Sequence, residues 1–254
     1  MTQANPLPGP LPGERENLRV EVWRGGADGA YQRFEVPRRA SQTVLDVVTH
    51  IQRFMDATLA YRFACRVGMC GSCAMTVNGV PRWTCRTHVD KVAREGSLTL
   101  APLANMPVVR DLVADMREFF DKWARARGQF VPTRTRADGF ARVDPRTRAR
   151  READAAIECI GCGVCYAACD VVGWNPAYLG PAALNRAWTL QNDVRDGAHG
   201  ERLDAVSGDA GCHSCHTQMS CTELCPKALS PTRSISGLKR ESLWSLLYGR
   251  GGKP

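Results

Sequence analysis

Apolar and polar residues alternate along two short segments near the start of the chain. Leu18, Val20 and Val22 are separated by charged residues, and after a glycine-rich turn the pattern resumes at Phe34 and Val36. A period of two residues is typical of a strand with one buried face. The two segments therefore predict a β-hairpin.

The apolar spacing then becomes helical. Thr43 is a suitable N-cap, and apolar residues recur every three or four positions after it, at Val44, Val47, Val48, Ile51 and Met55. We expect one amphipathic helix after the hairpin.

A second hairpin is predicted where Met75 and Val77 run into Asn78-Gly79, a dipeptide that tolerates the positive φ angles of a tight turn. A closing strand is expected from the apolar residues that follow, which are Leu98, Leu100 and Leu103. The first part of the chain thus reads as a sheet crossed by one helix.

The next predicted element is a helix that begins at Pro107, a residue that suits the first helical turn. One face of it is expected to hold Val109, Leu112, Val113, Met116, Phe120 and Trp123, and to pack across a domain junction. From about Pro132 to Ala153 the chain is rich in arginine. We interpret this stretch as a solvated connection rather than a partner-docking patch. Beyond about Ile157 we expect helices joined by cysteine-bearing turns.

The amino-acid composition limits which functions the chain can have. The chain has 254 residues, enough for two domains, with a formal charge of +8 and 12 cysteines. Its first residues lack the apolar stretch of a secretory signal, so we expect a reducing compartment, where clustered cysteines hold metal more often than disulfides. No segment approaches the ~18 uninterrupted apolar residues of a membrane span. The charge does not indicate nucleic-acid binding, because no helix has a basic stripe interleaved with aromatic residues.

The first cysteine set follows the pattern C-x4-C-x2-C with one distant cysteine, which is typical of plant-type [2Fe-2S] proteins. Its members are Cys65, Cys70, Cys73 and Cys85. Gly68 and Gly71 allow the loop to approach a small inorganic core, so that amide N–H groups can point at its sulfides. Zinc and disulfides are the alternatives, but structural zinc usually takes two separated cysteine pairs. The spacing favours a [2Fe-2S] cluster.

Two further runs have the bacterial ferredoxin spacing C-x2-C-x2-C-x3-C, in which the fourth cysteine binds the other cluster. The first run is Cys159, Cys162, Cys165 and Cys169, and the second is Cys215, Gln218, Cys221 and Cys225. Crossing the fourth cysteines assigns a [4Fe-4S] cluster to Cys159, Cys162, Cys165 and Cys225. It leaves three thiolates, Cys169, Cys215 and Cys221, for a [3Fe-4S] cluster, since Gln218 supplies no sulfur.

Cys212 lies outside this spacing. It is either a free buried thiol or a fourth ligand that completes a second [4Fe-4S] cluster. We favour the free thiol, because unpaired cysteines are often small buried apolar residues.

With three sets in this order, the chain resembles the iron-sulfur subunit of the succinate dehydrogenase and fumarate reductase family from about Leu18 to Lys239. The motifs that carry the resemblance are CRVGMCGSC from Cys65, PVVRDLVADM from Pro107, CIGCGVCYAAC from Cys159, WNPAYLGPAAL from Trp174 and CHTQMSCTELCPKALSPTRSI from Cys215.

The resemblance implies an α+β protein with an N-terminal β-grasp, plant-type [2Fe-2S] ferredoxin domain and a C-terminal all-α, bacterial-type two-cluster ferredoxin domain. We expect a flexible arm at 1–17, the first domain at 18–105, a helix and arginine-rich connection at 106–153, and the second domain at 154–254.

The resemblance also implies a role. A separate FAD-containing flavoprotein subunit would interconvert succinate and fumarate, and this chain would pass electrons from it to a quinone. No residue of this chain would be catalytic in the dicarboxylate chemistry. A membrane-anchor subunit of the cytochrome b type would hold the chain peripherally at the cytoplasmic face of the inner membrane. Trp174 and His216 occupy the positions that border the quinone in this family, whereas His213 is expected to be structural.

Asp170 departs from the family, which usually has proline there. A carboxylate at this place is a helix-terminal cap or, less favoured, a proton donor to quinone. Two other functions stay open on the sequence alone: an iron-sulfur subunit of another flavoprotein or of a thiol-linked fumarate reductase, and a zinc-stabilised binding module without redox activity.

Overall fold

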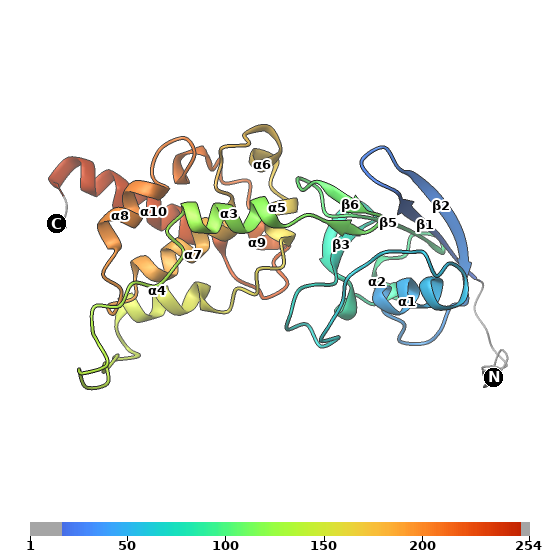
Figure 1. Cartoon of the computed structure of the whole chain (residues 1–254), viewed down its shortest axis with the longest axis horizontal. Coiled ribbons are helices and arrows are strands. Elements are labelled where there is room, and N and C mark those ends of the chain that lie inside the picture. Colours follow the sequence, from blue (N-terminus) through green and yellow to red (C-terminus); the bar gives the residue numbers. More distant parts are fainter. Residues whose placement is uncertain (1–16, 250–254) are drawn as a thin grey trace.

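Residues 17–249 are described by a computed structural model, and they form a β-rich lobe and a helical lobe that lie end to end (Figure 1). The fold class is α+β, as predicted. Apart from residue 17, the expected flexible arm falls outside the described residues. None of the helices described combines the length and apolar composition needed to cross a bilayer.

The β-rich lobe is a five-stranded sheet with the order β2-β1-β5-β3-β4. Its strands are β1 (Leu18–Arg24), β2 (Ala30–Val36), β3 (Ala74–Val77), β4 (Val80–Trp83) and β5 (Ser97–Ala101). β1 and β2 pair antiparallel from Leu18 opposite Val36, whereas β1 and β5 run parallel. Both predicted hairpins are therefore confirmed.

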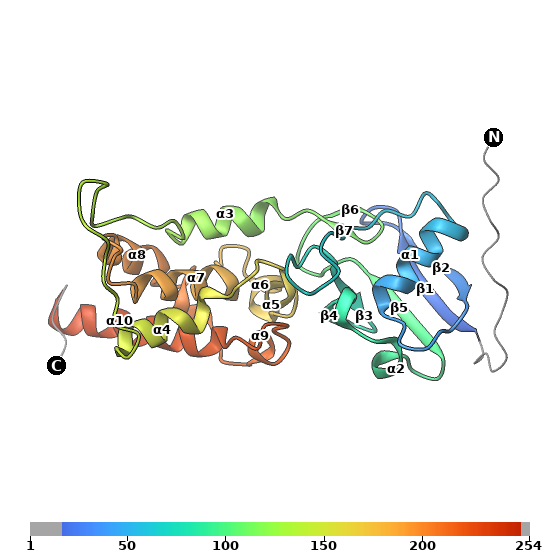
Figure 2. The same ribbon diagram turned by 90° about the horizontal axis from the view of Figure 1, so that it is seen from below.

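Helix α1 (Val44–Phe54) packs its apolar face on this sheet (Figure 2). It begins with a capping box: the Thr43 hydroxyl accepts from the Asp46 N–H at 3.2 Å, and the Asp46 carboxylate accepts from the Thr43 N–H at 3.0 Å. The predicted N-cap is confirmed. Two short elements, η1 (Thr84–Arg86) and α2 (Val89–Val92), complete the lobe.

The helix predicted from Pro107 is wrong over its first half. A hairpin of β6 (Val108–Arg110) and β7 (Val113–Ala114) stands there instead. Asp111 makes its turn with φ 51°, and the Asp111 carboxylate accepts from the N–H groups of Gly25 at 2.7 Å and Ala60 at 2.8 Å. These distant partners hold the segment out of the helical conformation.

Helix α3 (Arg117–Arg125) follows, and it lies along the helical lobe against α7 rather than across the junction (Figure 1). Its buried side chains are Phe119 and Lys122, whereas Phe120 is half exposed. The buried face of α3 is thus rotated about the helix axis from the face that the sequence predicted. Leu103 also differs from prediction, because β5 ends at Ala101 and Leu103 joins the core of the helical lobe.

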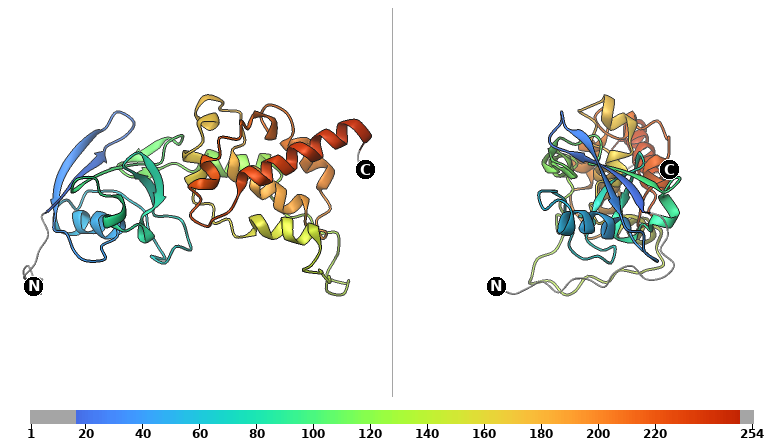
Figure 3. Two further views of the ribbon diagram at one scale, coloured as in Figure 1. Left: turned by 180° about the vertical axis from the view of Figure 1, so that it is seen from behind. Right: turned by 90° about the vertical axis from the view of Figure 1, so that its right-hand side faces the viewer.

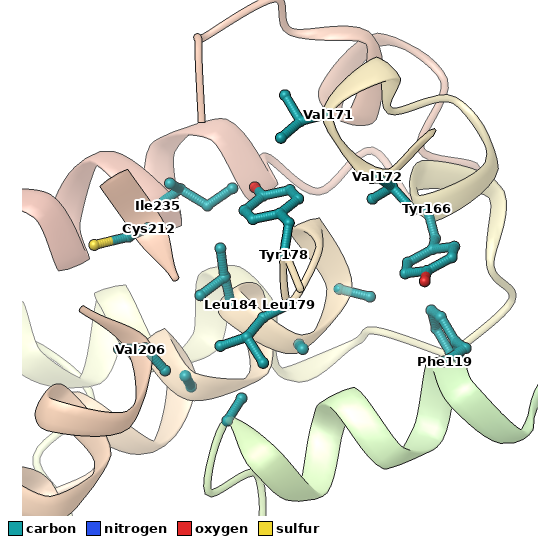
Figure 4. Packing of buried hydrophobic residues seen from close by; sticks show 14 of the residues in the cluster. Phe119, Tyr166, Val171, Val172, Tyr178, Leu179, Leu184, Val206, Cys212 and Ile235 are labelled. Carbon is teal, nitrogen blue, oxygen red and sulfur yellow. The ribbon is translucent and has the colours of Figure 1, made fainter. Parts of the chain in front are cut away.

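The helical lobe contains α4 (Arg148–Ile157), α5 (Val164–Ala167), α6 (Asp170–Trp174), α7 (Pro181–Gln191), α8 (His199–Val206), η2 (Cys212–Ser214), α9 (Ser220–Glu223) and α10 (Pro231–Tyr248). Helix α7 is almost wholly buried and packs against α4, α8 and α10. Figure 4 shows the core around it, in which Tyr166, Tyr178, Leu184 and Ile235 converge.

The arginine-rich stretch is mostly exposed and forms a protruding loop before α4. Its last part is helical, because Thr147 caps α4 by accepting a hydrogen bond from the Arg150 N–H at 3.2 Å.

Candidate metal centres

The first cysteine set lies at the end of the β-rich lobe that faces the helices. Three of its cysteines stand in the loop before β3, and Cys85 lies in η1 directly after β4. The Cys65 sulfur accepts hydrogen bonds from the backbone N–H groups of Val67 at 3.4 Å, Met69 at 3.2 Å and Cys70 at 3.3 Å. Because several amides point at one sulfur, the loop is suited to negative charge on it.

The cysteines of this set differ in their thiol pKa values. Although burial opposes it, hydrogen bonds from the Cys65 backbone and from Ser72 lower the pKa of Cys70 to about 6. Burial raises the pKa of Cys85 to about 11. The exposed side of the loop therefore favours a thiolate before any metal is bound, and the buried side does not.

The second set lines a small cavity of about 20 Å³ in the helical lobe. Its four sulfur residues are Cys159, Cys162, Cys165 and Cys225, and Pro226 and Leu229 close it on the apolar side. The first three come from the turn before α5 and from α5 itself, and Cys225 follows α9. Hence the last cysteine of one run lies with the first three of the other.

The third set lines a different cavity, also of about 20 Å³. Cys169, Cys215 and Cys221 share it with Tyr178, Ile235 and Gln218. The Cys169 sulfur accepts hydrogen bonds from the Val171 and Val172 N–H groups at the start of α6. The structure therefore separates the two runs into four thiols and three thiols.

The donor set of these cavities fits iron-sulfur clusters. Burial raises the pKa of five of their thiols, those of Cys159, Cys162, Cys165, Cys169 and Cys221. The thiolate is the form that binds metal, and in such surroundings it needs a compensating positive charge. The iron ions of a cluster supply that charge, and the apolar walls exclude water.

Cys212 does not line either cavity. It is fully buried in η2 within the core cluster, and in Figure 4 its sulfur points away from Tyr178. Burial raises the pKa of its thiol to about 11. This environment is that of a small apolar side chain.

Trp174 and His216 meet at the surface beside the third cavity. Their ring centroids are 5.5 Å apart and nearly edge to face, at 66°. His216 lines the cavity, and Trp174 is 66% exposed. The two residues thus form an aromatic pair at the surface next to the three-thiol site, and we call this pair the ledge.

Asp170 is not the cap that we expected, since Cys169 occupies the N-cap position of α6. It is instead the first residue of that short helix, exposed, and on the same side as Trp174 four residues later. His213 does not line the third cavity, and its ring shares a hydrogen bond of 3.1 Å with the Ser242 hydroxyl.

The sequence did not reveal two hydroxyl groups that contact sulfurs, or a buried lysine in the core of the helical lobe. The Ser72 hydroxyl lies 3.0 Å from the Cys70 sulfur, and the Thr232 hydroxyl lies 3.4 Å from that of Cys221. The buried Lys122 ammonium donates to the Tyr166 hydroxyl at 2.7 Å, and Tyr166 directly follows Cys165 in the sequence. Only the position of Ser72, two residues from a cysteine in one loop, carried a signal in the sequence.

Two family matches cover most of the chain. Residues 18–121 match the 2Fe-2S iron-sulfur cluster binding domain, and residues 155–229 match the 4Fe-4S dicluster domain.

Individual relatives agree with these matches. The chain is 38% identical to the succinate dehydrogenase iron-sulfur subunit of Paracoccus denitrificans, over 90% of this chain and 83% of that one. It is 34% identical to the fumarate reductase iron-sulfur subunit of Escherichia coli O157:H7, over 90% and 94%. A chain in the structure titled Mycobacterium smegmatis Sdh1 complex in the apo form superposes with a TM-score of 0.81 at 25% identity, covering 93% of this chain and 98% of that one.

Proposed function

This chain belongs to the iron-sulfur subunits of the succinate dehydrogenase and fumarate reductase family, and we propose that it relays single electrons between the FAD of a flavoprotein subunit and a membrane quinone. Membership in this electron-transfer family excludes the zinc-stabilised binding module. The dicarboxylate chemistry belongs to the flavoprotein in this proposal, and no residue of this chain acts in it as acid, base or nucleophile.

The observation that carries the proposal is the sorting of thiols into two separate cavities. One cavity collects four thiols and the other three, each with members of both cysteine runs. This supports a [4Fe-4S] cluster on Cys159, Cys162, Cys165 and Cys225, and a [3Fe-4S] cluster on Cys169, Cys215 and Cys221. The N-terminal loop and η1 would hold a [2Fe-2S] cluster on Cys65, Cys70, Cys73 and Cys85. When bound, such clusters accept and release one electron at a time.

The protein's own part is to hold the sulfurs, to set their surroundings and to keep the three sites in line. Amide N–H groups directed at Cys65 and Cys169 stabilise negative charge on those sulfurs. The third site lies at the surface, beside Trp174 and His216. We assign the quinone to this ledge, because an apolar indole and an imidazole N–H suit a quinone ring and its carbonyl oxygen.

The succinate dehydrogenase and fumarate reductase relatives favour a flavoprotein of that family over another flavoprotein or a thiol-linked fumarate reductase. Attachment to the membrane would then come from anchor subunits of the cytochrome b type, at the cytoplasmic face of the inner membrane.

Replacing Cys221 with serine in the assembled complex tests this relay. We expect quinone-linked succinate oxidation to be lost while dye-linked oxidation at the flavin survives. If both activities disappeared from an intact complex, or if quinone-linked turnover persisted, the proposed relay would be wrong.

A further inference from the structure

The last two turns of α10 project from the helical lobe (Figure 3). The helix is anchored by Ile235, Leu238 and Ser242, which are buried. Beyond them the exposure changes abruptly, because Leu243 is 54% exposed and Leu246 is 77% exposed. A helix that was packed against the core thus continues into solvent with apolar side chains.

These apolar residues form one surface. Leu243, Leu246 and Leu247 are three and four positions apart, so they share a face of the helix. Trp244 and Tyr248 contact one another beside them, with ring centroids 5.3 Å apart and ring planes tilted by 35°. We call these five residues the apolar tip. Leu247 and Tyr248 are 62% and 59% exposed, so nothing in the described chain covers this surface.

The sequence next to the apolar tip carries more positive than negative charges. Arg240, which is exposed one turn before the tip, is followed by Glu241, and the sequence continues with Arg250 and Lys253, which lie outside the described residues. Leucines together with tryptophan, tyrosine and basic residues are typical of helices that lie in the interface of a bilayer with anionic lipids. A protein partner would need an apolar pocket with an acidic rim to match this surface. A bilayer with anionic lipids supplies both an apolar interior and negative charge.

The position of the tip agrees with a membrane on that side. Its base is tied by the Ser242 hydroxyl to His213 in η2, three residues before His216 of the ledge. In Figure 1 α6, which carries Trp174, and the end of α10 both lie in the upper part of the helical lobe, α6 next to the β-rich lobe and the helix end at the opposite end. A flat membrane surface along this part of the lobe would therefore reach both the tip and the proposed quinone ledge.

We propose that the apolar tip of α10 binds directly to the interfacial region of a bilayer that contains anionic lipids. The tip thereby orients the ledge toward the membrane. This inference goes beyond the proposed function, since lipid binding needs neither succinate nor quinone turnover, and each can fail without the other.

The test is flotation of the full chain, carrying its clusters, with vesicles of phosphatidylcholine and phosphatidylglycerol. The variant carries both Leu246→Glu and Leu247→Glu, and partitioning should fall by about tenfold for each leucine lost from the interface. Both residues are exposed, so the substitutions leave the core intact, which unchanged visible absorption of the clusters would verify. Wild-type binding should also weaken on vesicles of phosphatidylcholine alone and at high salt.

Val109→Glu is the matched control. This valine is 56% exposed, but it stands in β6 of the β-rich lobe, and its loss should leave partitioning unchanged. The proposal is overturned if the wild-type chain does not float with anionic vesicles, or if both variants bind like it. It is likewise overturned if the double variant keeps its lipid binding but loses the anchor subunits, which would make the tip a protein-docking surface.

Discussion

A methyl group on Gly71 would lie 2.5 Å from the Cβ of Cys162 and 3.0 Å from its Cα. The loop of the first cysteine set is thus packed directly on the turn that carries the second set. Gly71 also has φ +72°, a conformation that other residues rarely adopt. Close approach of the two lobes depends on the absence of a side chain at this position.

Replacing Gly71 with alanine should push the lobes apart and slow electron transfer between the first and second sites. Gly79→Ala is the control, because Gly79 has φ +79° but no atom within 4 Å of an added Cβ. Both variants should lose roughly 1 kcal/mol of unfolding free energy from the positive φ, and Gly71→Ala should lose more. Thermal unfolding and freeze-quench EPR of the [2Fe-2S] signal would measure the two effects. Equal behaviour of the variants would refute the close contact.

Trp174→Leu removes the indole that faces His216 and leaves every cysteine in place. We expect the KM for quinone to rise and quinone-linked turnover to fall by about fivefold, since an aromatic contact contributes ~1 kcal/mol beyond its buried area. Dye-linked succinate oxidation should not change. His216→Gln should act in the same direction, whereas His213→Gln should not. If the two histidine variants were alike in steady-state assays, the ledge would not be the quinone site.

Cys212→Ser should keep the third cluster, because this thiol lies in the core and lines neither cavity. It should lower the unfolding free energy modestly, by about 1–3 kcal/mol, since a hydroxyl is placed in apolar surroundings. Cys221→Ser should lose the oxidised [3Fe-4S] EPR signal. Loss or conversion of that signal in the Cys212 variant would instead make Cys212 a ligand.

Arg202 and Asp196 form an ion pair at 2.9 Å with both side chains fully buried. Arg202→Met leaves the carboxylate buried without its charge partner, and we expect a loss of about 3–5 kcal/mol in unfolding free energy. Adding Asp196→Asn should restore a large part of this loss. Urea unfolding of the two variants would measure it, and no recovery in the double variant would show that packing rather than charge dominates.

The same pair predicts a pH dependence. Burial opposes ionisation of Asp196, but hydrogen bonds from Arg202 and from two backbone amides outweigh it and hold the pKa of this carboxyl below its ordinary value. The contribution of Asp196 to the stability of the wild type is therefore complete at pH values above the ordinary carboxyl pKa. It is lost as pH falls through the lowered pKa. In Arg202→Met the hydrogen bonds from the guanidinium no longer offset the burial of Asp196, so the pKa of Asp196 rises. Protonation of this carboxyl then stabilises the folded state as pH falls. The stability gap between the two proteins should narrow from pH 7 toward pH 5 in urea titrations, and a widening gap would contradict this assignment.

Local signals in the sequence predicted much of the β-rich lobe. The Thr43 cap is made by neighbouring residues, and the Asn78-Gly79 turn is signalled by its own dipeptide, although Asn78 also binds Val92 and Thr99. The hairpin at Asp111 has no such local signal, because its carboxylate binds amides 86 and 51 positions away. Lys122 is buried for a similar reason, since its partner Tyr166 is 44 positions away. The cysteine sets were accessible from spacing, but the ring contact of Trp174 with His216 required the fold.

In the proposed relay, succinate reduces the clusters of this chain in sequence toward a quinone. EPR spectra of the anaerobically purified native assembly, recorded oxidised and again after addition of succinate, test this order of reduction directly. We expect an oxidised [3Fe-4S] signal that fades as a reduced [2Fe-2S] signal appears. If the clusters are present but succinate changes neither signal, electrons do not enter this chain from succinate and the proposed function is wrong.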